Sequence, residues 1–173
     1  MDLIKNNIRN IPDFPKMGVS FKDITPLLLD PIATKEVIKY FKIRYKGRKI
    51  NKIACIESRG FIFGAMLAQA LDMGFIPIRK PNKLPPEVER VEYTLEYGTD
   101  VLEIRKDSII PGEKILLVDD VLATGGTARA ATQLIERLGG EVLECAFLIS
   151  LDFLNGKEKL SKHNIFSLIE YKE

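Results

Sequence analysis

Two neighbouring acids followed by a run of small residues are the part of this chain best suited to chemistry. Asp119 and Asp120 come directly after the apolar run 116–118, and residues 123–127 open a helix-like stretch. Backbone N–H groups at a helix start, together with threonine hydroxyls, can bind a phosphate dianion. Two carboxylates beside a phosphate call for a partner that donates hydrogen bonds, such as ribose hydroxyls, or for a hydrated Mg²⁺. A sugar phosphate with free hydroxyls provides both a phosphate for the N–H groups and hydrogen-bond donors for the carboxylates.

The same stretch has a purely structural interpretation. The two acids can form a helix N-terminal cap, and the two glycines can form an ordinary turn. An acid doublet favours the phosphate site over this alternative. The chain contains neither Gly-x-x-x-x-Gly-Lys-Ser/Thr nor Gly-x-Gly-x-x-Gly. The sequence therefore gives no support to a P-loop NTPase or a dinucleotide-binding protein.

Composition excludes several classes of function. With 173 residues and 46% hydrophobic content, the chain has the size of one globular domain. A formal net charge of +2 gives no reason to expect a nucleic-acid binder. His163 is the only histidine, which removes Ser-His-Asp chemistry and His-rich metal sites. Cys55 and Cys145 lie in apolar runs and are expected to be buried thiols. With no signal-peptide pattern at the start, the cytoplasm is the expected compartment.

Apolar patterning predicts the elements that must position these residues. A helix with an N-terminal cap at Asp30 and a first-turn proline is expected from residue 31, with its apolar stripe extending to residue 45. Strands are expected at 53–56, 75–79, 115–118 and 142–151, and helices at 61–71 and 128–138. The strands are apolar without alternation, so both of their faces must be covered. The predicted fold class is α/β, a parallel sheet flanked by helices on both faces, with ligands at the carboxyl ends of the strands.

One segment departs from this alternation of strands and helices. Residues 80–90 contain three prolines, and apolar positions at 91–95 and 101–104 flank a turn at Gly98. This pattern predicts a loop that ends in a hairpin. A long polar loop in a small domain favours a lid over the ligand site, and a mobile surface loop is the alternative.

Several of these stretches resemble known proteins. Residues 118–127 resemble the phosphoribosyl-pyrophosphate (PRPP) binding motif of type I phosphoribosyltransferases. The stretches 12–26, 57–61, 79–85 and 95–100 resemble the adenine phosphoribosyltransferase family, in the expected order along nearly the whole chain. The resemblance implies a single domain over residues 1–173, with an N-terminal hood over about 1–30 and a lid over about 80–104. It further implies that this glycosyltransferase of purine salvage makes AMP and pyrophosphate from adenine and PRPP, uses Mg²⁺ and forms a homodimer.

The resemblance also assigns roles to individual residues. It implies binding of the 5′-phosphate by Ala123, Thr124, Gly125, Gly126 and Thr127, and of the ribose and its nearby Mg²⁺ by Asp119 and Asp120, with no direct metal ligand from the protein. It implies that the rest of PRPP or AMP contacts Ser58, Arg59, Arg79, Lys80, Lys83 and Tyr97. Adenine would lie against Val19, Ser20, Phe21 and Lys22. The implied catalytic residues are Glu96, for proton transfer on the purine, and Arg59.

Alternatives remain at particular positions. The four predicted cations can be solvated surface charges; they are Arg59, Arg79, Lys80 and Lys83. Phe21 can simply pack in the core. Lys22 stands where the family usually has arginine, and enzymes for 6-oxopurines use a lysine at the ring oxygen. Asn82 and Pro86 replace common lid glycines and are expected to stiffen the lid. A phosphoribosyltransferase for another purine, or a PRPP-binding regulator without catalysis, are the other candidate functions.

Overall fold

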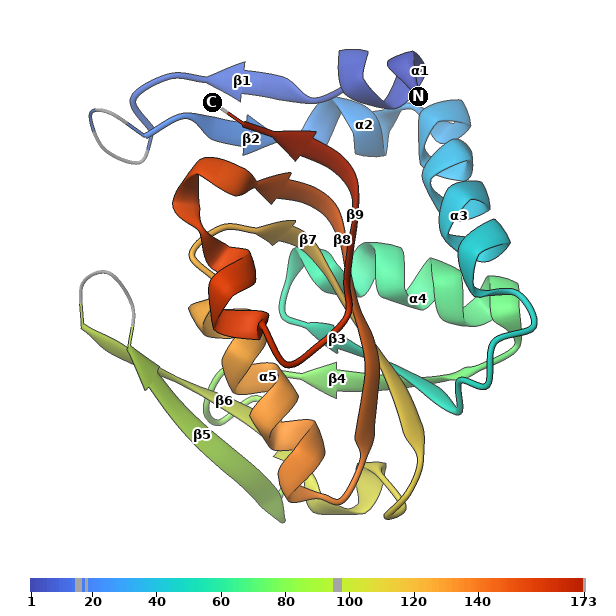
Figure 1. The fold of residues 1–173 in the computed structure, drawn as a ribbon, viewed down its shortest axis with the longest axis vertical. Helices are drawn as coiled ribbons and strands as arrows, with labels where there is room; N and C mark the ends of the chain where they lie inside the picture. Colours follow the sequence, from blue (N-terminus) through green and yellow to red (C-terminus); the bar gives the residue numbers. More distant parts are fainter. Residues whose placement is uncertain (15–16, 18, 95–97, 173) are drawn as a thin grey trace. The chain divides into compact units, whose positions relative to one another are not determined.

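The computed structural model describes residues 1–14, 17, 19–94 and 98–172 (Figure 1). The chain forms two compact units, Met1–Tyr45 and Lys46–Glu173. Within the described residues, no helix is long and apolar enough to cross a membrane. The single domain with a hood and a lid stays a prediction.

The first unit contains three helices and a small sheet. Its elements are α1 (Asp2–Asn6), β1 (Arg9–Ile11), β2 (Phe21–Asp23), α2 (Thr25–Leu29) and α3 (Pro31–Tyr45). β1 and β2 pair antiparallel. The predicted cap of α3 is confirmed, because Asp30 Oδ1 accepts hydrogen bonds from the backbone N–H of Ile32 (2.8 Å) and Ala33 (3.1 Å). The four short elements before α3 were not predicted, since strands of three residues carry no readable periodicity.

The second unit is built on a five-stranded parallel sheet in the order β4-β3-β7-β8-β9. Its strands are β3 (Lys52–Ile56), β4 (Gly74–Ile78), β7 (Lys114–Leu122), β8 (Glu141–Leu151) and β9 (Ile165–Tyr171). The other elements are α4 (Arg59–Leu71), the hairpin β5 (Val88–Thr94) and β6 (Thr99–Arg105), α5 (Gly126–Arg137), and the short 3-10 helices η1 (Lys106–Ser108), η2 (Asp152–Leu154) and η3 (Gly156–Leu160).

Alternate residues of the sheet face different helices. Ala54 and Ile56 belong to the core that includes the buried residues of α5 and of the β5–β6 hairpin. Cys55, which points to the opposite face, packs against Gly64 of α4. Both faces are therefore covered (Figure 1), and the predicted fold class is confirmed. Cys55 and Cys145 are buried free thiols, as expected.

The structure differs from the predicted boundaries in two places that matter for the site. β7 continues to Leu122, so Asp119 and Asp120 lie within the strand rather than after it, and α5 begins at Gly126, ahead of the predicted start. β9 was not predicted, because this edge strand is mostly half-buried and lacks the continuous apolar character of β7 and β8.

The predicted hairpin is present as the antiparallel pair β5–β6. Its buried side chains, which include Val91 and Leu102, join the core on the α5 side of the sheet. In the preceding loop, Asn82 has a φ of 63°. Asparagine tolerates this left-handed conformation better than most residues. Closure of the hairpin as a lid stays a prediction.

Candidate active site

The acid doublet of β7 is paired with the first residue of α4. Asp120 is buried, and its Oδ2 lies 2.8 Å from Arg59 Nε. Asp119 Oδ1 accepts a hydrogen bond from the Asp120 backbone N–H at 2.9 Å. β3 and β7 are parallel neighbours, so the loop after β3 that leads to Arg59 lies at the same edge of the sheet as the end of β7. The structure thus brings together three of the predicted site residues.

Burial sets the protonation of these two acids. It raises the pKa of Asp119 well above its ordinary value, and the neighbouring Asp120 charge raises it further. Burial also raises the pKa of Asp120, while the Arg59 charge opposes that shift. Burial thus disfavours negative charge on the pair, so a ligand that donates hydrogen bonds or positive charge would stabilise the ionised carboxylates.

Gly60 allows α4 to start this close to the acids. A Cβ atom at residue 60 would lie 2.7 Å from Asp119 Oδ1 and 3.1 Å from the Val118 carbonyl oxygen. Real Cβ atoms do not approach the first of these so closely. A glycine directly after Arg59 therefore lets α4 start against Asp119 without displacing its carboxylate.

The loop between β7 and α5 has the form expected of a phosphate cradle. Gly125 precedes α5 with a φ of 78°, in the left-handed region that favours glycine. A Cβ at Gly125 would overlap the carbonyl oxygen of Gly156, and a Cβ at Gly156 would overlap that of Ala123. η3 thus supports the loop from behind through backbone contact. Sequence reasoning missed Gly156, since nothing in its neighbourhood marks it apart from its being a glycine.

The same loop and the start of α5 carry hydrogen-bond donors. The first N–H groups of α5 have no partner within the helix, and the helix dipole makes this end positive. Thr124 is exposed and Thr127 is half-buried. Among the residues that the structure describes, neither hydroxyl makes a side-chain hydrogen bond. This arrangement is suited to binding a phosphate.

The remaining predicted cations are placed differently from one another. Arg79 follows β4 and is paired with Glu57, with Nη2 3.0 Å from Oε1. Lys80 Nζ is paired with Asp100, which also accepts from Tyr93 Oη at 3.2 Å. Arg79 and Lys80 are therefore partly exposed cations that are each paired with a carboxylate. Sequence reasoning did not identify these carboxylates, although Glu57 and Asp100 each lie inside one of the stretches that carry the resemblance.

Two other predicted residues of the second unit are Lys83, in the loop after β4, and Ser58, in the loop after β3. Lys83 contributes its carbonyl oxygen to Arg79 Nη1 at 3.1 Å. Ser58 immediately precedes α4. Glu96 and Tyr97 lie outside the described residues, so their roles stay predictions.

The predicted adenine-binding segment forms part of β2 and the residues before it. Phe21 packs edge-on against Phe14, with ring centroids 5.2 Å apart. Lys22 Nζ donates to Asn10 Oδ1 at 3.0 Å, and Ser20 Oγ donates to the same oxygen. Val19 is 38% exposed. Contact of this segment with adenine stays a prediction.

The side chains suit a metal ion that arrives with a ligand better than one caged by protein. Among the described residues, no group of three or more His, Cys, Asp or Glu side chains could hold a metal. Asp119 and Asp120 offer two adjacent carboxylates, of which Asp120 is already paired with Arg59. Such a pair can accept hydrogen bonds from the waters of a Mg²⁺ ion bound elsewhere.

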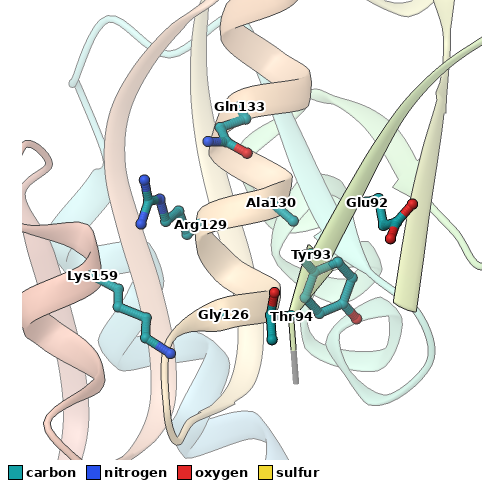
Figure 2. Close-up of a pocket in the computed structure, with 8 residues that line it drawn as sticks. All are labelled: Glu92, Tyr93, Thr94, Gly126, Arg129, Ala130, Gln133 and Lys159. Atoms are coloured by element: carbon teal, nitrogen blue, oxygen red, sulfur yellow. The ribbon is translucent and has the colours of Figure 1, made fainter. Parts of the chain in front are cut away.

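A cavity of about 260 Å³ lies beside α5 (Figure 2). Its lining comes from α5, β5 and η3, namely Glu92, Tyr93, Thr94, Gly126, Arg129, Ala130, Gln133 and Lys159. In Figure 2, Lys159 lies on one side of α5 and Tyr93 on the other. The cavity shares only Gly126 with the predicted site residues, so it is not the predicted substrate site.

Comparison with known protein families identifies the type of domain. A phosphoribosyl transferase domain matches residues 25–171. The parallel sheet with its flanking helices is thus the fold of a phosphoribosyltransferase. The adenine phosphoribosyltransferase of Christiangramia forsetii is 55% identical over 168 residues, covering 97% of this chain and 98% of the relative. That of Roseiflexus sp. is 57% identical over 164 residues, or 95% of each chain.

Solved structures give the same result. The crystal structure of adenine phosphoribosyltransferase from Thermoanaerobacter pseudethanolicus has a TM-score of 0.95 and 52% identity, covering 98% of this chain and 99% of that one. The enzyme from Saccharomyces cerevisiae, complexed with an imino-altritol bisphosphate and adenine, has a TM-score of 0.93 and 41% identity over 96% and 97% of the two chains. The chain belongs to the adenine phosphoribosyltransferase family.

Proposed function

We propose that this chain transfers the phosphoribosyl group of PRPP to adenine, giving AMP and pyrophosphate. The observation that carries the proposal is the Asp119–Asp120 doublet, paired with Arg59 and followed within one loop by the open N-terminus of α5. One end of this arrangement suits a phosphate and the other suits ribose hydroxyls. The adenine-bound relative from Saccharomyces cerevisiae supports adenine as the base.

The proposed mechanism is one of positioning and electrostatics. The N–H groups and hydroxyls of residues 123–127 hold the 5′-phosphate, and the two carboxylates hold the ribose hydroxyls. Positive charge that develops on the ribose as its bond to pyrophosphate breaks is stabilised by Asp119 and Asp120. Arg59, Arg79, Lys80 and Lys83 face the negative charge that develops on the pyrophosphate. A Mg²⁺ ion bound with PRPP would neutralise part of that charge, and Asp119 and Asp120 would accept hydrogen bonds from its waters.

The base is proposed to bind at the first unit. Val19, Ser20, Phe21 and Lys22 would contact adenine, and Glu96 would handle the proton on the purine as the ring nitrogen attacks. Lys22 Nζ donates to Asn10 Oδ1 at 3.0 Å, which holds the ammonium beside Ser20 and β1. We further propose that the chain acts in purine salvage in the cytoplasm as a homodimer, with a hood and a lid that complete the site.

A competition assay tests the reaction and the base together. Purified protein receives PRPP and Mg²⁺ with adenine, hypoxanthine and guanine in equal amounts, and the nucleotides are separated by chromatography. AMP alone is the expected product. IMP or GMP as the main product would refute the adenine assignment but keep the PRPP site. Bound PRPP with no nucleotide formed would refute catalysis and favour a regulator.

A further inference from the structure

Glu57 makes an unusually complete set of contacts beside the predicted pyrophosphate end of the site. Its Oε1 accepts from Arg79 Nη2 at 3.0 Å, and its Oε2 accepts from Arg79 Nε at 3.2 Å. The same Oε2 accepts from the Lys80 backbone N–H at 2.8 Å. One carboxylate therefore binds both the guanidinium of Arg79 and the backbone of the next cation along the chain. A two-pronged contact of this kind fixes direction as well as distance.

The contacts hold Arg79 without using up its donors. Arg79 Nη1 donates to the Lys83 carbonyl oxygen at 3.1 Å, and the guanidinium carbon lies 5.9 Å from the centre of the Phe61 ring. A guanidinium has five N–H bonds, and three of them are engaged in this way. Within the part of the chain that the structure describes, one N–H on each of Nη1 and Nη2 has no acceptor. Those two can bind an anion while the other three keep the group in place.

Both partners are attached to fixed backbone. The Glu57 N–H donates to the Ile78 carbonyl oxygen at 2.9 Å. Arg79 and Glu103 exchange two backbone hydrogen bonds, at 2.9 and 2.8 Å. The loop after β3 is thereby joined to the end of β4 and to β6 of the hairpin. Burial raises the pKa of Glu57, but the hydrogen bonds from Arg79 and Lys80 outweigh it and hold that pKa below its ordinary value. The carboxylate is therefore charged at neutral pH.

We propose that Glu57 is a positioning residue for the pyrophosphate end of the site. It directs the Arg79 guanidinium and the Lys80 backbone so that the unused donors of Arg79 meet the leaving pyrophosphate. The inference rests on the proposed function, because that function places pyrophosphate at Arg79 and Lys80. Glu57 itself touches no reacting atom in this scheme.

Glu113, which directly precedes β7 and pairs with Lys52 at the start of β3, provides a matched control at the opposite edge of the sheet. Its side chain is 16% exposed, the same as that of Glu57. It accepts from Lys52 Nζ at 2.8 Å and from the Ile110 backbone N–H at 2.9 Å, and these bonds likewise lower its pKa. Lys52 is the first residue of β3, whereas Glu57 directly follows the last. Glu113→Gln thus removes a similar ion pair far from the predicted pyrophosphate.

The test compares Glu57→Gln, Glu57→Asp and Glu113→Gln with the parent protein. Calorimetry measures binding of inorganic pyrophosphate with Mg²⁺, steady-state kinetics give KM for PRPP and for adenine, and thermal melting gives Tm. Glu57→Gln is expected to weaken pyrophosphate binding and raise KM for PRPP by about tenfold. KM for adenine should stay within about twofold. Glu57→Asp should fall between Gln and the parent, and Glu113→Gln should lower only Tm.

The outcomes separate this inference from the proposed function. Equal pyrophosphate affinity in Glu57→Gln and Glu113→Gln, with equal losses in Tm, would show that Glu57 is merely structural. Parent protein that binds no pyrophosphate would overturn the inference as well. Parent protein that binds pyrophosphate, with Glu57→Gln weakened, but makes no AMP would refute the proposed function and leave the positioning role of Glu57 standing.

Discussion

The phosphate cradle and the cation site, which joins the end of β4 to the β5–β6 hairpin, meet the same substrate in our proposal but are built in opposite ways. The cradle is one continuous stretch, from Asp119 to the start of α5, and its donors are backbone N–H groups and hydroxyls. The cation site takes its cations from residues 79 and 80 and anchors them on carboxylates about 20 residues away in the chain, 22 for Glu57 and 20 for Asp100. The first region depends on backbone conformation, whereas the second depends on side-chain pairing across segments.

The largest effect that tests this contrast is expected at Gly125. Gly125→Ala places a Cβ against Gly156 and forces alanine to a φ of 78°. We expect kcat/KM for PRPP to fall by about 100-fold or more, because the N–H groups of the loop must move from their positions. Steady-state kinetics with varied PRPP measure this.

Gly112→Ala is the control for Gly125→Ala. Gly112 has a φ of 89° but nothing within 4 Å of its added Cβ. This substitution brings the same kind of backbone strain, of about 1 kcal/mol, without the collision. A similar loss of kcat/KM in both variants would show that general destabilisation, rather than the shape of the cradle, accounts for the result.

A substitution at Asp119 should lower activity by an intermediate amount and at the same time raise stability. Asp119→Asn keeps the acceptor for the Asp120 N–H but removes a charge that burial disfavours. We expect kcat/KM to fall by about tenfold to 100-fold, because the ribose loses a carboxylate partner. Tm at pH 7 should rise, since the variant no longer carries a buried charge. Kinetics and thermal melting on the same samples measure both.

The difference in stability between the parent protein and Asp119→Asn should depend on pH. The folded-state pKa of Asp119 is raised above the ordinary 3.8, so the folded protein holds a proton that the unfolded chain releases. The parent protein therefore loses stability as pH rises from about 3.8 through the raised pKa, and the advantage of Asp119→Asn grows over that window. Below pH 3.8 the two should melt alike.

Asp107→Asn is the control with the reverse sign. A hydrogen bond from Arg105 lowers the pKa of Asp107, so any stability from that exposed pair is present above the ordinary pKa and is lost on acidification. A rise in Tm at pH 7 for Asp107→Asn equal to that for Asp119→Asn would contradict burial as the cause.

The same contrast explains what could be predicted from the sequence. Asp119, Asp120 and residues 123–127 are contiguous and follow an apolar run, so their local order was enough to predict an anion site there. Glu57 and Asp100 acquire their roles only when strands 20 or more residues apart are brought side by side, as in the Arg79 contact. Gly156 is a similar case, because its role comes from meeting Ala123 across two loops.

The fold divides along similar lines. Buried strands such as β3 and β8 carry continuous apolar runs, and these were predicted close to their observed bounds. β9 lies at the edge of the sheet and is mostly half-buried, and β1 and β2 have three residues each. None of these three contains enough buried positions to produce a periodic signal, since their structure depends on their neighbours.

The smallest expected effect concerns the link between the two regions. Arg137, in the last turn of α5, donates from Nη1 to the Arg90 carbonyl oxygen at 2.9 Å and to Glu89 Oε1 at 3.2 Å, joining the cradle helix to β5. Its side chain is 53% exposed, so Arg137→Ala should lower the free energy of unfolding by no more than about 1 kcal/mol. If the two regions bind their parts of PRPP independently, KM for PRPP should stay within about twofold.

Lys114→Ala serves as the control for Arg137→Ala. Lys114 is also partly exposed, and its Nζ lies 3.7 Å from Glu141 Oε2, but it lies at the start of β7, away from the hairpin. Urea unfolding gives the two stability changes, and kinetics with varied PRPP give KM. An increase in KM several times larger for Arg137→Ala than for Lys114→Ala would show that the hairpin and the cradle act as one unit. Side-chain pairs on the hairpin would then control the backbone geometry of the phosphate cradle. The two regions would differ in how they are built but would bind PRPP together.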